Sequence, residues 1–409
     1  MKGKKALKIL GIIAAVFTLF VVTTCCVTVI GNNANLKKAN SFEPVQIENQ
    51  LVPAMDENGY HTFTTDRDFK VMQLTDIHIG GGWMSLKKDA MALNAVAAMI
   101  TAEKPDLVIV TGDIAYPVFF QAGTFNNRSG AKIFAALMEK LGVYWTVTLG
   151  NHDSEIYSYY NREKVSDFYS ESDFKYCLYQ PGPEDVDGYG NHVINVKNSK
   201  GEITQSFFMF DSHSYTDGDY FGIFWKYDNI HENQVEWYRQ TVKQLNAHNA
   251  AVTTNPAATV KSTAFFHIPL TEQRDAWYEF MDNGYKDTEN VKLIYGVAGE
   301  DGKIVYPGMG EDGLFEAMLE LDSTKAVFCG HDHENNFSVD YKGIRLSYAM
   351  SVDYLAYPGI YKRGIQRGCT VITYSPDGSF DCKNENYYQD KYVSLYKKEP
   401  VTMQEVVNG

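Results

Sequence analysis

Side chains of the kinds that bind metal ions follow five short apolar stretches of the chain. They are Asp76 with His78, Asp113, Asn151 with His152 and Asp153, His267, and His331 with His333. Each block alone is weak evidence for a metal site, because Gly-Asp is a common turn and a single histidine after a strand is usually structural. His331 and His333 say more, because residues two apart in an extended segment project from one face. The complete ordered set predicts a metal site.

The apolar stretches alternate with helical patterns in the first half of the chain. Leu93, Val96, Ala97 and Ile100 have the spacing of one buried helix face, and Gly142 would end a second helix. The expected strands are residues 69–74, 107–110, 143–148, 206–210, 261–266 and 326–329, with another helix at 232–245. Strands that alternate with helices predict an α/β fold with a parallel sheet, whose ligand sites form at the carboxyl ends of the strands.

Composition restricts the class of partner. The chain has 409 residues, 44% of them hydrophobic, which is enough for a large core, and a formal net charge of −14. Nucleic acid is therefore an unlikely partner, whereas a small phosphorylated substrate is compatible with a local metal charge. The six cysteines form no CxxC pair, so any metal must be held by His, Asp and Asn. Cys369 and Cys382 would pair only if their strands were neighbours.

The N-terminus carries a membrane or export signal. Lys2, Lys4, Lys5 and Lys8 precede an uncharged apolar run from Ile9 to Ile30. About 20 apolar residues span a bilayer, whereas a cleaved signal has an apolar region of about 7–15 residues. We therefore expect an anchor with the body of the protein outside the cytoplasm, and a secreted protein is the alternative.

The expected layout has one folded domain after the anchor. It consists of a basic flank (1–8), the apolar segment (9–30), a polar linker (31–65), the catalytic domain (66–380) and a C-terminal tail (381–409). The oligomeric state is left open.

The five polar blocks resemble those of the calcineurin-like metallophosphoesterase superfamily over about residues 66–375. The segments Phe265–Leu270, Gly330–Phe337 and Tyr189–Asn191 are similar to its purple-acid-phosphatase-like branch. The resemblance implies an α/β fold with a β-sandwich core flanked by helices and a dinuclear metal centre at the strand ends.

The same resemblance implies a role for each block. Asp76, His78 and His333 would bind one metal ion, Asn151, His267 and His331 would bind the second, and Asp113 would bridge both. Oxygen and imidazole ligands favour Fe, Zn or Mn, which would activate a bridging hydroxide as the nucleophile. His152 would act as the general acid. Asp153 would either orient the His152 ring or be an ordinary loop carboxylate.

Tyr116 competes with His78 for one position. The segment Gly112-Asp113-Ile114-Ala115-Tyr116 resembles the block that supplies a tyrosinate ligand in purple acid phosphatases, where the position of His78 is usually not histidine. Imidazole binds a metal without losing a proton at neutral pH, whereas phenol has a pKa near 10. We therefore expect His78 to be the ligand and Tyr116 to line the wall.

The expected activity is hydrolysis of a phosphate monoester. The alternatives are a phosphodiester or nucleotide substrate, and a non-catalytic protein that binds a phosphorylated ligand. Residues 154–261 have the least regular pattern of strands and helices, and we expect the loops in this stretch to decide substrate specificity. His213, Trp237 and Tyr157–Tyr160 are expected to be structural rather than substrate-binding.

Overall fold

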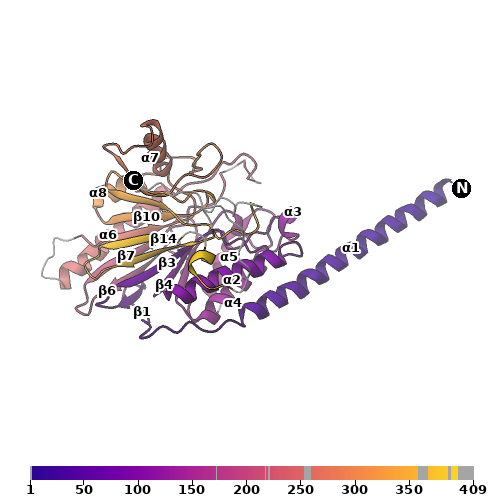
Figure 1. The fold of residues 1–409 in the computed structure, drawn as a ribbon, viewed down its shortest axis with the longest axis horizontal. Coiled ribbons are helices and arrows are strands. Elements are labelled where there is room, and N and C mark those ends of the chain that lie inside the picture. Colours follow the sequence, from indigo (N-terminus) through magenta and orange to yellow (C-terminus); the bar gives the residue numbers. More distant parts are fainter. Residues whose placement is uncertain are drawn as a thin grey trace.

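The computed structural model describes residues 2–171, 173–216, 218–219, 222–252, 259–310, 312–357, 367–385 and 388–394. Two β-sheets stack face to face and helices cover the outer face of each, so the domain has four layers (Figure 1). This is the expected β-sandwich flanked by helices. The expected strands and helices are all present, with ends that differ by a few residues.

The smaller sheet contains the first three expected strands. Its order is β14-β13-β3-β4-β5, and β3, β4 and β5 are parallel. The strands are β3 (Phe69–Leu74), β4 (Leu107–Thr111), β5 (Trp145–Thr148), β13 (Cys369–Tyr374) and β14 (Phe380–Glu385). Helices α2 (Leu86–Glu103) and α4 (Asn127–Leu141) bury their apolar faces against it. Gly142 ends α4 with φ 72°, which places its N–H 3.1 Å from the Met138 carbonyl.

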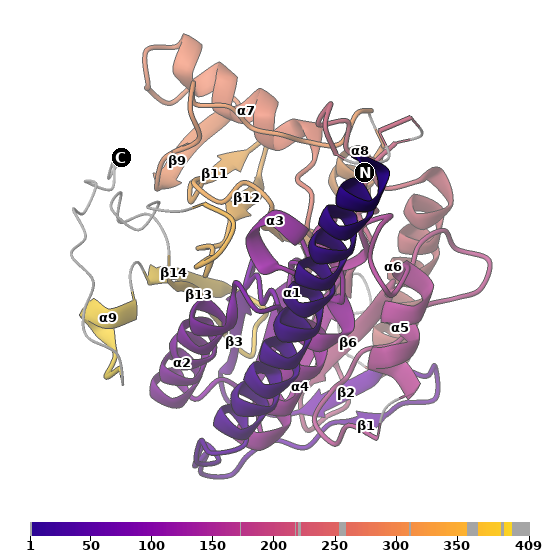
Figure 2. The same ribbon diagram turned by 90° about the vertical axis from the view of Figure 1, so that its right-hand side faces the viewer.

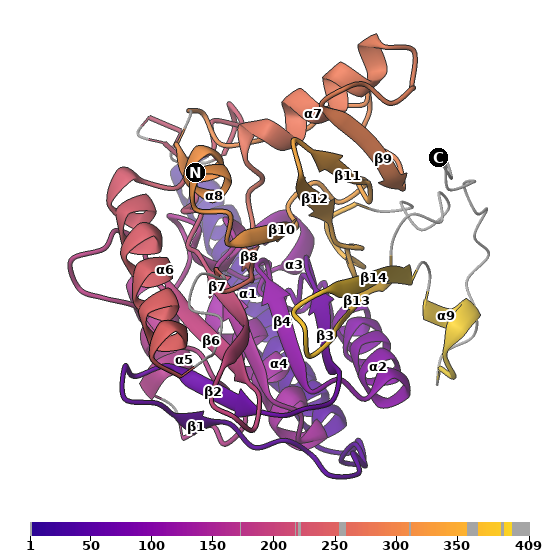
Figure 3. The same ribbon diagram turned by 90° about the vertical axis from the view of Figure 1, so that its left-hand side faces the viewer.

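The larger sheet has the order β1-β2-β6-β7-β8-β10-β12-β11-β9. Its strands are β1 (Ala54–Met55), β2 (His61–Thr64), β6 (His192–Lys197), β7 (Ile203–Met209), β8 (Ser262–Phe265), β9 (Val291–Tyr295), β10 (Thr324–Cys329), β11 (Ser338–Tyr341) and β12 (Ile344–Tyr348). Helices α6 (Glu232–Val252), α7 (Thr271–Asp282) and α8 (Leu314–Leu321) pack on its outer side (Figure 3). Strands β7, β8 and β10 are parallel, so their carboxyl ends meet at one edge.

Aromatic and aliphatic side chains from both sheets fill the space between them. Phe69 of β3 stacks on Phe207 of β7 with ring centroids 5.9 Å apart, and Phe265 stacks on Phe328 at 5.5 Å. Burial on this inner face fixes the strand register, because a slip of one residue would turn these rings to the outside.

The expected linker at residues 31–65 is wrong in part. Helix α1 runs from Lys2 to Ala39, and its last turns pack on the domain, where Asn32 and Asn35 donate to the carbonyls of Gly81 and Leu86 at 2.8 and 3.1 Å. Strand β2 then joins the larger sheet, parallel to β6. Contacts with distant residues hold the end of α1 and strand β2 in place, and no local sequence pattern predicts such contacts.

The C-terminal end also differs from the expected boundary at residue 380. Strand β14 crosses that boundary and pairs with β13 along its whole length. In this ladder Cys382 lies opposite Ile372 and Cys369 opposite Glu385, so no disulfide joins the two cysteines although their strands are neighbours. Residues 395–409 of the expected tail lie outside the described residues.

Helix α1 projects its N-terminal half away from the domain (Figure 1). By length and composition it can cross a membrane, and a signal sequence near the N-terminus has the same properties. Its C-terminal half lies beside α2 and α4, close to the short helix α3 (Phe119–Ala122) (Figure 2). The remaining short elements are a 3₁₀ turn (His152–Ser154), α5 (Arg162–Glu171) and α9 (Tyr388–Lys391).

Candidate metal centre

The carboxyl edges of the two sheets meet at one place, and the polar blocks lie there. Asp76 and His78 follow β3, Asp113 follows β4 and Asn151 follows β5 in the smaller sheet. His267 follows β8, and His331 and His333 follow β10 in the larger sheet. The structure brings all seven expected ligands together, and each is at most 9% exposed.

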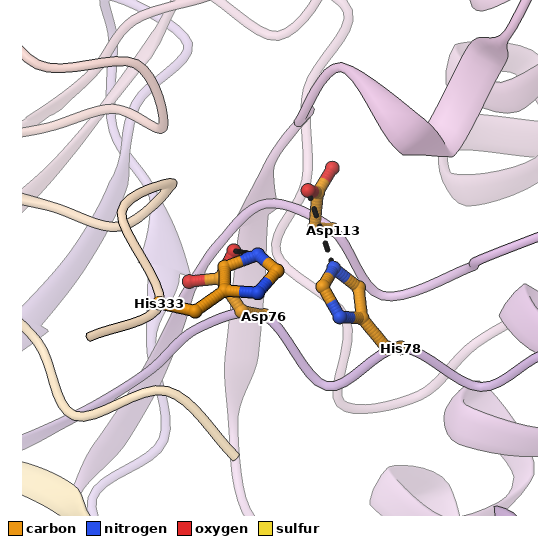
Figure 4. A group of neighbouring side chains, drawn as sticks. All are labelled: Asp76, His78, Asp113 and His333. Carbon is orange, nitrogen blue, oxygen red and sulfur yellow. Dashed lines mark hydrogen bonds and ion pairs between the residues drawn. The ribbon is translucent and has the colours of Figure 1, made fainter. Parts of the chain in front are cut away.

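One group of ligand atoms comes from Asp76, His78, Asp113 and His333 (Figure 4). These atoms lie within 4.8 Å of one another. His333 Nε2 is 3.3 Å from Asp76 Oδ1, and His78 Nε2 is 3.3 Å from Asp113 Oδ2. The spacing suits a single ion at the centre of the group.

A second group meets at Asn151. Its side-chain oxygen is 3.1 Å from His267 Nε2 and 3.0 Å from His331 Nδ1. His267 Nε2 is also 3.2 Å from Asp113 Oδ2, the same oxygen that faces His78. Asp113 therefore lies between the two groups, in the position of a bridging carboxylate.

Close approach of the loops depends on glycine. A Cβ at Gly150 would lie 2.1 Å from Asp113 Oδ1, and one at Gly330 would lie 1.9 Å from Thr75 Oγ1. Four of the expected ligands adopt left-handed backbone conformations, with φ between 50° and 78°: Asp76, His78, Asp113 and His331. Such residues cost about 1–3 kcal/mol each and are concentrated at functional sites.

The ring orientations fit bound cations. His267 Nδ1 is 2.8 Å from the Thr111 carbonyl, which can only accept a hydrogen bond, so Nδ1 carries the proton. In the neutral ring Nε2 then directs a lone pair at the oxygens of Asn151 and Asp113. Acceptors that face one another at this distance suit a shared cation, and oxygen with imidazole suits Fe, Zn or Mn.

The charges of the group lead to the same conclusion. Burial alone would lower the pKa of His267, but the carboxylates of Asp113 and Asp76 outweigh it and raise this pKa to about 9. Burial also opposes the shift at His78, whose pKa is raised by hydrogen bonds to Asp113 and Asp353. The carboxylates that favour a protonated imidazole here would likewise favour a bound metal cation.

Asp353 was not expected, and it orients two of the ligands. Its carboxylate is 3.2 Å from His78 Nδ1 and 3.6 Å from His333 Nδ1, on the side of each ring away from the centre. Carboxylates in this position fix the tautomer and direction of a metal-binding imidazole. The only sequence signal is weak, since Asp353 follows the end of β12 by five residues.

Glu155 holds the ring of His152. Its Oε1 is 2.7 Å from His152 Nδ1, and the carboxylate is buried while the ring is 22% exposed. The Tyr215 hydroxyl donates to the same oxygen at 3.2 Å and accepts from Asn151 Nδ2 at 2.9 Å. A continuous network therefore joins an expected metal ligand to the expected acid.

The ring-orienting role considered for Asp153 is wrong. Both Asp153 oxygens accept hydrogen bonds from backbone N–H groups, those of Asp113, Ala115 and Gly150, each at 2.9 Å. Asp153 thus ties the loop after β4 to the loop after β5. The spacing of three residues between His152 and Glu155 was the sequence signal that would have identified the real partner.

A family model for the calcineurin-like phosphoesterases matches residues 69–335 of this chain. The chain belongs to the calcineurin-like phosphoesterase family. It is therefore a phosphoester hydrolase by family, and the match covers every expected ligand.

Curated relatives place the chain near the purple acid phosphatases. Probable inactive purple acid phosphatase 28 of Arabidopsis thaliana is 28% identical over 317 residues, which cover 72% of this chain and 73% of the relative. Phosphatase DCR2 of Saccharomyces cerevisiae is 28% identical over 293 residues, 67% of this chain and 45% of the relative. A solved dimetal phosphatase from Danio rerio aligns over 79% of this chain and 97% of its own, with a TM-score of 0.49 and 11% identity.

Tyr116 in this phosphoesterase forms part of the wall. Its hydroxyl donates to Gln121 Oε1 at 2.6 Å, and its ring lies against His78 and His152 with centroids 4.6 and 4.7 Å away. Burial and the charge of Asp353 raise the pKa of Tyr116 above its usual value, which disfavours tyrosinate.

The centre opens into a cavity of about 130 Å³. Its lining includes Asp113, His152, His331 and His333 of the centre, together with Trp225, Tyr227, Glu300, Tyr306, Asp332 and Tyr357. His213 lies elsewhere and hydrogen-bonds Gln234 at 2.9 Å, while Trp237 packs on Phe208 and Phe210.

Proposed function

We propose that this phosphoesterase hydrolyses phosphate monoesters at a dinuclear metal centre. The observation that carries the proposal is the position of Asp113 Oδ2, between His78 Nε2 and His267 Nε2 at 3.3 and 3.2 Å. Two complete ligand groups on either side of one carboxylate support two ions rather than one.

Each ligand group would hold one ion. Asp76, His78 and His333 would hold the first, Asn151, His267 and His331 the second, and Asp113 would contact both. Fe, Zn or Mn bound there would supply positive charge for the phosphoryl oxygens and would lower the pKa of the attacking water. The ligands would fix the positions of the ions, and burial would strengthen their attraction for the phosphoryl oxygens because the local dielectric is low.

His152 would donate a proton to the leaving oxygen. Its Nδ1 is engaged by Glu155, which leaves Nε2 for the substrate, and the residue borders the cavity. The carboxylate of Glu155 orients the ring through a charged hydrogen bond, and the Tyr215 hydroxyl keeps that carboxylate in place.

A nucleotide or diester is the second candidate substrate. Trp225 is 64% exposed at the cavity mouth and lies 6.1 Å from the ring of Tyr306. An exposed indole can stack on a base. The third candidate is a non-catalytic binding protein, a possibility raised by the word inactive in the name of the Arabidopsis relative.

The test uses His152→Ala with metal content as the control. We expect turnover of phenyl phosphate to fall by about 10²-fold or more while the bound metal stays at two ions per chain. Turnover equal to wild type would remove His152 from the reaction. Faster turnover of bis-phenyl phosphate than of phenyl phosphate by the wild type would favour the diesterase, and two bound metals without turnover of either would favour the binding protein.

We also propose that α1 anchors the chain, with the catalytic domain outside the cytoplasm. The apolar run from Ile9 to Ile30 and the basic residues before it support this orientation. In intact cells, external protease should digest the domain, and alkaline carbonate should leave the full chain in the membrane. Release of a shortened chain into the medium would instead indicate a cleaved signal.

A further inference from the structure

Two uncharged loops form an exposed apolar surface beside α1. Residues 77–86 and 114–127 contain no Asp, Glu, Lys or Arg. They lie side by side, because the Met84 N–H donates to the Ala122 carbonyl at 3.1 Å and the Trp83 indole lies over Gly123. We call Trp83, Met84, Phe119, Phe120 and Phe125 the apolar face.

The apolar face is unusually open to solvent. Phe120 is 85% exposed, and Met84, Phe119 and Phe125 are 42–47% exposed. The rings are ordered against one another, since Phe119 stacks on Phe125 with centroids 4.9 Å apart. A contiguous apolar surface of this kind usually marks a contact with a partner or a membrane.

Helix α1 places its apolar run beside the apolar face. The ring of Phe20 meets the ring of Trp83 edge-on at 6.1 Å, and Phe20 lies inside the apolar run from Ile9 to Ile30. Asn32, just beyond the run, donates to Gly81 in the same loop. Twelve residues of helix separate these contacts, about 18 Å of its length. Helix α3 lies beside α1 in Figures 1 and 2.

Basic residues directly follow the two loops that form the apolar face. Beyond Leu86 the next residues are Lys87 and Lys88, and beyond Asn127 come Arg128 and Lys132. A cavity of about 230 Å³ between α1 and α4 has Arg128 and Lys132 on its wall. In a chain with a net charge of −14, this basic border matches anionic lipid headgroups.

We propose that the apolar face inserts into the bilayer beside α1, with Phe119, Phe120 and Phe125 in contact with lipid. Aromatic side chains are enriched where membrane proteins meet the bilayer interface. The inference rests on the proposed anchor and is independent of the phosphate chemistry.

Docking would bring the catalytic centre to the membrane surface. Gln121 of α3 accepts a hydrogen bond from Tyr116, whose ring lies against His78 and His152. The apolar face and the wall of the metal centre are thus parts of one packed unit, within reach of phosphate esters at the bilayer surface.

Quenching of tryptophan fluorescence by brominated lipids tests the contact. The full chain is reconstituted in vesicles of phosphatidylcholine and phosphatidylglycerol, with and without bromine on the acyl chains. We expect bromine to quench the wild type, Trp83→Phe to lose most of this quenching, and Trp83→Phe/Phe120→Trp to regain it. The matched control, Trp83→Phe/Val252→Trp, places the reporter on an exposed residue of α6, on the opposite side of the domain from the projecting end of α1, and should not regain it.

Equal quenching of the Phe120→Trp and Val252→Trp reporters would overturn the proposal. So would a blue-shifted Phe120→Trp reporter that bromine does not quench, which would mean that a second copy of the chain covers the face. If the full chain did not float with the vesicles in a density gradient, both the proposed anchor and the proposed membrane contact would be contradicted. Asp113→Asn should lose turnover and keep the quenching, so failure of the catalytic proposal is distinguishable.

Discussion

Replacing Glu155 by glutamine should weaken the proton donation assigned to His152. Glutamine keeps the volume and an accepting oxygen for the 2.7 Å contact with His152 Nδ1, but it replaces a charged acceptor by a neutral one. A hydrogen bond to a charged group contributes about 1.5–3 kcal/mol against about 1 kcal/mol for a neutral one. The difference is about 0.5–2 kcal/mol, and its midpoint of about 1.25 kcal/mol corresponds to a roughly 8-fold lower kcat. The Glu155 side chain is 2% exposed, so solvent screens little of this effect.

The leaving group separates proton donation from a general loss of structure. Phenolate leaves poorly without a proton, whereas p-nitrophenolate needs little help. We expect Glu155→Gln to lower kcat about 8-fold for phenyl phosphate and less than about 2-fold for p-nitrophenyl phosphate. Glu139→Gln is the matched control, because Glu139 is a partly buried carboxylate that accepts from Trp145 and Tyr176. Equal losses for both esters, or none, would refute the role of Glu155.

Two further predictions concern the surroundings of the centre, and a third concerns a buried histidine of β6. Asp353→Asn should weaken the affinity for one of the two metal ions by about 10–100-fold, measured by competition with a chelator, because it removes the charge that orients two imidazoles. Tyr116→Phe should keep turnover within about 3-fold of the wild type, and neither protein should absorb near ~550 nm, because the hydroxyl bonds Gln121 rather than a metal. Burial lowers the pKa of His192 to about 3, so the unfolded chain binds the extra proton below pH ~6.5 and stability is lost as the pH falls. Between pH 7.5 and 5.5 the wild type should lose about 1.4 kcal/mol more stability than His192→Gln, measured by urea unfolding in detergent; identical slopes would contradict the assignment.

Much of the fold follows from local patterns. The run Phe69–Leu74 and the helix face of Leu93 and Ile100 were visible because burial on one side repeats at a fixed spacing. Strand β2 was missed for the converse reason. His61–Thr64 has only four residues, and its place in the sheet comes from pairing with β6, more than 120 positions away.

In the metal centre, too, some residues follow from local sequence patterns and others only from the tertiary fold. Its expected ligands stand directly after strands, so their convergence follows from parallel strands that end at a common edge. Asp353 orients two ligand imidazoles and Glu155 orients the ring of His152, and their loops reach the site only through the tertiary fold. The short spacing from His152 to Glu155 could have been noticed, whereas the contacts of Asp353 with His78, 275 positions away, could not.

The most direct test is a titration of metal into the metal-free chain while phenyl phosphate turnover is recorded. The two ligand groups that share Asp113 predict that activity rises to its maximum at two equivalents per chain, and that Asp113→Asn shows no such rise. A maximum at one equivalent, or no turnover when two equivalents are bound, would contradict a dinuclear hydrolytic centre.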